Sequence, residues 1–331
     1  MRSKRSYFVI LTALCILTGL CVFVCLRFGS ASLRFSQVWH GLLRSDPGAP
    51  ETQILWSVRL PHAAGCFLAG FALALSGLLL QTATANPLAG PNIIGVNAGA
   101  GFAMVLTMAL VPMAYRFVPL ICSVGAFLCT LLIVFVSTKA GGSRVTIVLA
   151  GVAISTLLGA GISLLKLIDP DLAVIYHSFS VGGVSGVLFG DLALPAAIIA
   201  VCAVAATMLS GRLNLLCLGD TIALGLGVRV KALRTVALIL ASALAAAAVS
   251  FAGLLGFVGL MVPHMARKLL GCTDVRRLLP VCALLGAVLV MISDLLGRTL
   301  FAPSQIPAGI VTAVLGAPFF FILLLQRRNR L

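Results

Sequence analysis

Long stretches without Asp, Glu, Lys or Arg alternate with short basic segments along the whole chain. Residues 235–266 are the most informative stretch, because they are 32 residues long and have basic residues on both sides. One bilayer crossing takes about 20 apolar residues, so this stretch is too long for one crossing and short for two. Basic residues favour the cytoplasmic side, so both ends are expected there. The stretch is therefore predicted to enter the membrane and return. Residues 253–263 are expected to form a turn and a short helix, so that 235–252 and 256–266 are antiparallel.

Seven further uncharged stretches follow the same pattern; they are 6–26, 60–115, 117–138, 145–165, 192–211, 278–293 and 299–326. The stretch 60–115 is interrupted by Asn86-Pro87-Leu88-Ala89-Gly90-Pro91 and is predicted to form two helices, because proline removes a backbone donor and forces a turn. The pattern predicts an all-α, polytopic membrane protein. It has one transmembrane domain, residues 1–331, with about ten transmembrane helices, some of them short or interrupted.

The composition excludes a soluble protein and gives the expected orientation. Hydrophobic residues make up 61% of the chain and charged residues 9%, which no soluble domain of this size could bury. With the N-terminus inside, 16 of the 23 basic residues fall in cytoplasmic segments. The net charge of +15 is therefore an orientation signal rather than a nucleic-acid footprint. Both termini are expected in the cytoplasm, with residues 6–26 as an uncleaved first helix in the cell membrane.

Candidate chemistry is scarce, so we expect no enzymatic activity, no metal site and no cofactor in this chain. The sequence has no GxxxxGK[ST] phosphate loop and no clustered acid, base or nucleophile. Eight of the ten cysteines lie in apolar stretches, as small packing residues do. Asp294 lies four residues before Arg298, so the two side chains are expected to pair on one helix face near the outer end.

Four segments of the chain are rich in glycine and proline. They are 86–101, with Asn86, Pro87 and Pro91; 218–227, in the largest inner loop; 256–276, with Gly256, Gly259 and Pro263; and 307–318. Irregular backbone at membrane depth survives only where protein or a water-filled path satisfies it, which makes such breaks typical of transport proteins. Residues 218–227 are short and amphipathic, as a docking helix would be, although an ordinary solvated loop has the same pattern.

With Arg59-Leu60-Pro61, these segments resemble the FecCD family, the permease subunits of type II ABC importers for iron–siderophores, haem and cobalamin. The resemblance runs from about Arg59 to the C-terminus. It implies a dimer of permease subunits, a cytoplasmic ATPase dimer that binds the ATP, and an extracytoplasmic substrate-binding protein. The ATPase-coupling residues that it implies are Gly219, Asp220, Ala223, Gly227, Arg267, Gly271, Asp274 and Arg276. It also implies that Arg59 and Arg298 are outer-surface arginines that dock the binding protein.

The chain departs from the family pattern at three positions. His62 and Leu224 stand where the family often has arginine, and Val275 stands where it often has histidine. We interpret the chain as a permease that translocates a ferric siderophore or similar metal chelate into the cytoplasm. A haem or cobalamin permease is the alternative. An ion-coupled secondary transporter is a further alternative, which the scarcity of intramembrane charge disfavours.

Overall fold

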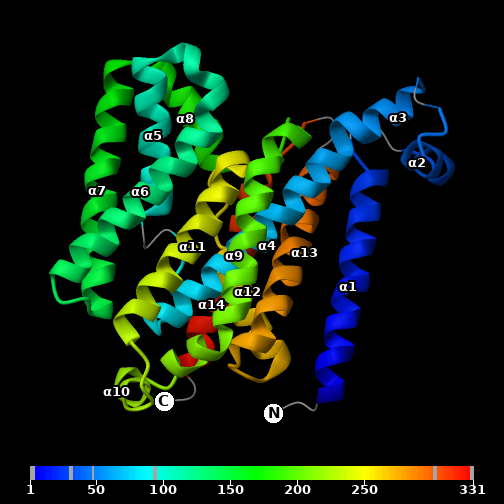
Figure 1. Cartoon of the computed structure of the whole chain (residues 1–331). Coiled ribbons are helices and arrows are strands. Elements are labelled where there is room, and N and C mark those ends of the chain that lie inside the picture. The colour runs from blue at the N-terminus through cyan, green and yellow to red at the C-terminus, as the bar shows by residue number, and fades with distance from the viewer. Residues whose placement is uncertain (1–3, 30–32, 47, 92–94, 301–303, 329–331) are drawn as a thin grey trace.

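Only helices and their connections occur in the described part of the computed structural model, which covers residues 4–29, 33–46, 48–91, 95–300 and 304–328 (Figure 1). The first half of the chain contains α1 (Lys4–Arg27), α2 (Phe35–Leu42), α3 (Pro50–Ile54), the π-helical turn η1 (Leu55–Arg59), α4 (Leu60–Thr84), α5 (Val96–Leu110), the 3-10 turn η3 (Pro112–Phe117), α6 (Val118–Lys139) and α7 (Arg144–Ile168). The second half contains α8 (Asp171–Val181), α9 (Phe189–Leu216), α10 (Asp220–Gly225), α11 (Val230–Ala252), α12 (Val258–Leu270), α13 (Val275–Thr299) and α14 (Ala308–Arg328).

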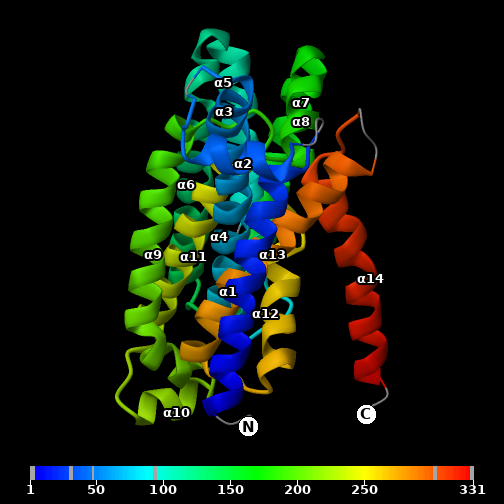
Figure 2. The same cartoon turned by 90° about the vertical axis from the view of Figure 1, so that its right-hand side faces the viewer.

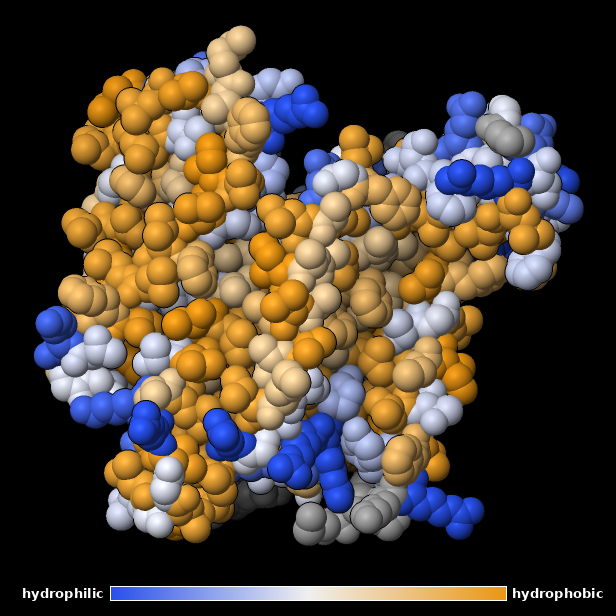
Figure 3. Space-filling view, in the orientation of Figure 1, coloured by the Kyte–Doolittle hydropathy of each residue, from blue (hydrophilic) through white to orange (hydrophobic). Residues whose placement is uncertain are grey.

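The prediction of an all-α polytopic membrane protein is confirmed. Within the described ranges, seven helical segments are long and apolar enough to cross a membrane, and α5 and α14 are shorter apolar helices. The count of about ten membrane helices, which also requires the short helix α12, stays a prediction. The face seen in Figure 3 is mainly apolar, with hydrophilic residues gathered towards its two ends.

Two polar segments that separate the apolar stretches are partly helical. Residues 29–58 contain α2 and α3, and residues 166–191 contain α8. Pro50 begins α3, where its missing N–H costs nothing, and Asp171 lies in the first turn of α8. Figure 1 places α2 and α3 at one end of the bundle, while α1 begins and α14 ends at the other end, where α10 also lies. Pro47, between α2 and α3, lies outside the described residues.

Helix α4 is the centre of the bundle and packs against α11, α12 and α13. Small residues allow this close approach. A Cβ on Gly70 would meet the backbone of Gly286 in α13, and a Cβ on Gly77 would meet the backbone of Gly259 in α12. In Figure 2, by contrast, α14 stands at the edge of the bundle, where it contacts α12 and α13.

The predicted reversal within residues 235–266 is confirmed. Helix α11 ends at Ala252, the backbone turns at Gly253 (φ +61°), and α12 begins at Val258. The Leu254 amide donates to the Phe179 carbonyl (3.1 Å), so α8 helps to hold the turn. The two helices do not form the simple antiparallel pair we expected, because both pack mainly on α4. Gly259 is a packing glycine rather than a turn residue, and the second positive φ is at Phe257 (+64°).

Candidate functional site

The segment between α9 and α11 forms a short apolar helix at the end of the bundle where α1 begins. Gly219 and Gly227 bracket α10, with φ of +98° and +77°, a backbone region that other residues adopt only with strain. Ala223 is fully buried. The neighbouring Ile222, Leu224 and Leu226 are 55–60% exposed. A buried alanine under an exposed apolar rim is the geometry expected of a docking helix.

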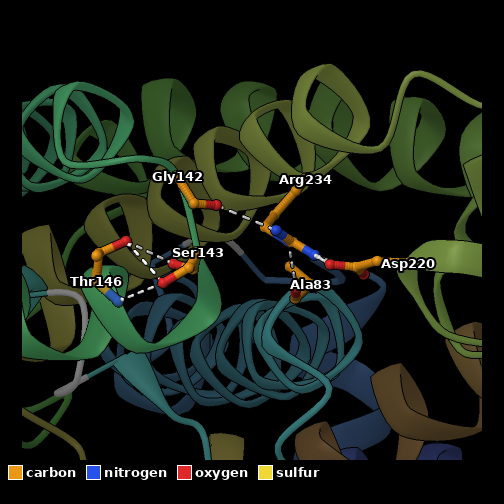
Figure 4. A network of polar contacts seen from close by, with 6 residues as sticks. All are labelled: Ala83, Gly142, Ser143, Thr146, Asp220 and Arg234. Atoms are coloured by element: carbon orange, nitrogen blue, oxygen red, sulfur yellow. Dashed lines mark hydrogen bonds and ion pairs between the residues drawn. The ribbon is translucent and has the colours of Figure 1, made fainter.

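Arg234 of α11 ties this segment to the bundle core (Figure 4). Its side chain is 5% exposed and donates from Nη2 to both carboxylate oxygens of Asp220, each at 2.8 Å. Its Nε donates to the Ala83 carbonyl at the end of α4 (3.1 Å), and its Nη1 to the Gly142 carbonyl between α6 and α7 (3.3 Å). One buried guanidinium therefore joins α4, α10, α11 and the α6–α7 turn. The sequence pattern gave no sign of this role for Arg234, because its partners are far away along the chain.

The turn between α12 and α13, which holds the predicted coupling residues Asp274 and Arg276, is also tied to a long helix. Asp274 caps α13 by accepting from the Arg276 amide (3.1 Å). Asn214 of α9 donates to Asp274 Oδ1 (2.6 Å) and accepts from the Val275 amide (2.7 Å). The Arg276 side chain lies against Gly211 of α9, where a Cβ would clash with it. Asp274 and Arg276 therefore join the α12–α13 turn to α9.

Arg267, predicted as a coupling residue, faces α4. Its Nη1 donates to Gln81 Oε1 (2.6 Å), and Gln81 Nε2 lies 3.4 Å from the Gly259 carbonyl and 3.3 Å from that of Leu260. Pro263 has no N–H to offer to the Gly259 carbonyl one turn earlier, so Gln81 replaces the missing donor. Gly271, with φ +64°, ends α12 in the left-handed conformation.

The other predicted helix breaks lie beside the start of α12. Asn86 Oδ1 accepts from the Leu88 amide (2.9 Å) and shapes the turn after α4, in which Pro87 is exposed. Pro91 lies where a Cβ on Gly259 would touch its ring. Gly256 has open space around it. The break after α4 and the break before α12 are thus neighbours, which their separation in sequence did not indicate; residues 92–94 lie outside the described residues.

At the opposite end of the bundle, Arg59 and Arg298 are buried, with 6% and 8% exposure. Arg59 Nη1 donates to the carbonyls of Leu26 (2.6 Å) and Arg27 (2.8 Å) at the end of α1. Arg298 Nε forms the expected ion pair with Asp294 Oδ2 (2.8 Å). Both arginines were expected to be exposed on the outer surface. In the structure they are buried instead, and each stabilises a helix end. Their role in docking stays a prediction.

His62 occupies the position where the family often has arginine, and it also contacts Asp294. Its Nε2 lies 2.9 Å from both carboxylate oxygens. The ligand atoms of His62, Cys66 and Asp294 all lie within 4.8 Å of one another and are buried, a spacing that could hold a metal ion. The ion pair between Asp294 and Arg298 competes with that role, because a cation already neutralises the carboxylate. We therefore interpret the cluster as an ion-pair network that joins α4 to α13.

Replacing Asp294 by asparagine is expected to destabilise the outer end of the bundle by about 3 kcal/mol, because it leaves the buried Arg298 without its counter-charge. Thermal unfolding of the purified protein measures this effect. Asp191→Asn is the matched control, since Asp191 is exposed at the start of α9. Equal unfolding temperatures for the two variants would show that the buried pair contributes nothing.

Comparison with known proteins identifies relatives over nearly the whole chain. The model of the FecCD transport family matches residues 15–326. The Iron(3+)-hydroxamate import system permease protein FhuB of Bacillus subtilis (strain 168) is 34% identical over 333 residues, which cover all of this chain and 86% of that protein. The Fe(3+) dicitrate transport system permease protein FecC of Escherichia coli (strain K12) is 40% identical over 292 residues, 86% of each chain.

A third relative and a solved structure agree with this match. The Hemin transport system permease protein HmuU of Yersinia pestis is 34% identical over 313 residues, 92% of this chain and 91% of that one. A structure described as an inward-facing conformation of a metal-chelate type ABC transporter superimposes with a TM-score of 0.84 at 30% identity. It covers 96% of this chain and 99% of its own.

Proposed function

Because the chain belongs to the FecCD transport family and is a multi-pass membrane permease, we propose that it is the membrane subunit of an ATP-driven importer that carries a ferric siderophore or similar metal chelate into the cytoplasm. The observation that carries the proposal is the α10 segment, an exposed apolar helix braced from inside by Arg234. A rigid connection of this kind is needed where force generated outside the membrane must move helices inside it.

The partners follow from this role. A cytoplasmic ATPase dimer binds ATP and contacts α10 together with the α12–α13 turn, so the chain itself holds no cofactor and carries out no chemistry. A second permease subunit, identical or homologous, completes the path. Helix α14 supports this pairing, because it lies at the edge of the bundle and exposes Val314 (64%) and Phe321 (68%). An extracytoplasmic binding protein delivers the chelate at the end where α2 and α3 lie.

Transport proceeds by alternating access. Closure of the ATPases on ATP favours one arrangement of the helices, and hydrolysis restores the other, so the path opens to each side in turn. Asp220 and Asp274 carry the motion differently. Asp220 connects α10 to α4 and α11 through Arg234, whereas Asp274 connects the α12–α13 turn to α9 through Asn214.

The substrate class is tested by reconstituting the permease in proteoliposomes with its ATPase and binding protein. ATP-dependent accumulation of a ferric hydroxamate or ferric citrate is expected to exceed that of haem and cobalamin. The names of the relatives FhuB, FecC and HmuU refer to iron(3+)-hydroxamate, Fe(3+) dicitrate and hemin, respectively. Preferential haem uptake would therefore favour the alternative, a haem permease. Uptake driven by an ion gradient without ATP would contradict the importer assignment.

The proposed orientation places both termini and α10 in the cytoplasm of a cell whose inner membrane the chain crosses. In intact cells, a membrane-impermeant maleimide is expected to label Asp46→Cys, in the exposed turn between α2 and α3. It is expected to reach the native Cys272, between α12 and α13, only after permeabilisation. A variant without Cys272 is the control for that signal. Labelling of Cys272 in intact cells would invert the topology.

A further inference from the structure

A groove of about 620 Å³ lies between the inner ends of α9 and α11, beside the segment after α10. Apolar side chains line most of it, from Leu209 and Leu215 on α9 to Ala232 and Val236 on α11. Two arginines complete the lining, Arg212 and Arg229. The volume is in the range of ordinary ligand sites, which run from about 300 to 1,000 Å³.

The height of the groove in the membrane follows from the charge pattern. The uncharged stretch 192–211 ends immediately before Arg212, and Arg229 lies six residues before the start of the uncharged stretch 235–266, with Lys231 and Arg234 between them. The two arginines therefore lie at the level where the hydrocarbon gives way to headgroups, while Leu209 and Val236 lie on its hydrocarbon side.

The two guanidinium groups are available for an anion. Both residues are exposed, and among the described residues neither side chain has a hydrogen-bond or ion-pair partner. The carboxylate of the α10 segment, Asp220, lines a neighbouring pocket with Arg229 but already binds Arg234 through both oxygens. The groove thus combines two uncommitted positive charges at headgroup level with an apolar floor at acyl-chain level.

We propose that this groove binds one anionic phospholipid of the inner leaflet, with its phosphate between Arg212 and Arg229 and an acyl chain along Leu209 and Val236. Basic pockets between transmembrane helices on the cytoplasmic side are the sites where anionic headgroups bind. Leu226 and Gly227 form the remaining wall. The lipid would therefore brace the α10 segment from the membrane side, while Arg234 braces it from the core.

Native mass spectrometry of the purified full-length chain, titrated with phosphatidylglycerol, tests the proposal. Arg212→Gln/Arg229→Gln is expected to weaken binding of the first lipid about 30-fold, since each basic residue at the surface contributes a factor of about five. The control is Arg5→Gln/Lys139→Gln, which removes two exposed charges from the same side of the bundle and is expected to change that affinity less than twofold. If both double variants weakened lipid binding equally, the affinity would depend on general surface charge, and the proposed site would be contradicted.

A photoreactive phosphatidylglycerol locates the lipid. Cross-links are expected in peptides that span 205–216 and 226–236, and phosphatidylcholine or excess inorganic phosphate is expected not to displace it. Displacement by phosphate would indicate a free-anion site, and cross-links spread evenly over other helices would indicate bulk lipid. Loss of the cross-link when the ATPase is added would show that protein, not lipid, covers the groove. Each of these three outcomes contradicts the proposal, whether or not the chain transports a ferric chelate.

Discussion

Gly227→Trp is expected to abolish substrate accumulation in proteoliposomes while the assembled ATPase continues to hydrolyse ATP. Gly227 has φ +77°, and no other residue lies within 4 Å of a Cβ built there. The strain therefore comes from the backbone, about 1–2 kcal/mol for a left-handed residue with a side chain. The chain will relax by moving the end of α10, and the indole adds bulk to the docking surface. The measurements are ATPase activity, its stimulation by loaded binding protein, and uptake.

Two smaller substitutions separate backbone strain from bulk. Gly225, inside α10, also has open space but an ordinary helical φ. Gly227→Ala is expected to lower coupling severalfold, whereas Gly225→Ala is expected to leave it unchanged and to favour the helix. Normal accumulation with Gly227→Trp would mean that the α10 segment is a passive connector and that the ATPase engages elsewhere, with residues 267–277 as the next candidate.

Arg234→Met is expected to lower stability and to uncouple transport together. The substitution keeps much of the side-chain volume but leaves Asp220 and the carbonyls of Ala83 and Gly142 without their shared donor. Loss of one partner of a buried pair costs about 3–5 kcal/mol. The lower end of that range applies here, because the Asp220 side chain is 42% exposed and water compensates part of the loss. Thermal unfolding and uptake per hydrolysed ATP measure the two effects.

Lys231→Met is the matched control, since Lys231 lies one turn earlier on α11 and is exposed. It is expected to leave both measurements unchanged. Asp220→Asn provides the second arm of a double-mutant cycle, which isolates the energy of the Arg234–Asp220 contact. Additive effects of the two substitutions would show that the contact does not couple α10 to the bundle core.

The helical architecture was predictable because the membrane limits what a backbone can do. A chain in hydrocarbon must satisfy its own N–H and C=O groups, so long uncharged stretches have to be helices and their charged ends have to lie at the surface. That constraint is local, and it yielded the two helices within 60–115 and the reversal within 235–266. It did not predict α2 and α3, whose polar sequence lies outside the apolar pattern.

The candidate site was predictable only in part. Gly219 and Gly227 could be picked out because glycine is the residue that a sharp helix boundary needs. Arg59 and Arg298 were placed on the outer surface because the family resemblance implies that such arginines dock the binding protein. Their partners are the carbonyls at the end of α1 and the side chain of Asp294. The carbonyls come from a helix 32 or 33 residues away, a contact that no local spacing reveals.

The sequence by itself determined the class and the main membrane helices, because hydropathy and charge act residue by residue against the bilayer. Only the tertiary structure decided which groups meet. Gln81 takes over the carbonyl that Pro263 leaves free, and Pro91 contacts Gly259. Arg234 joins four segments that span residues 83 to 234. These contacts depend on how helices pack around the small-residue faces of α4, and packing is a property of the whole bundle rather than of any one segment.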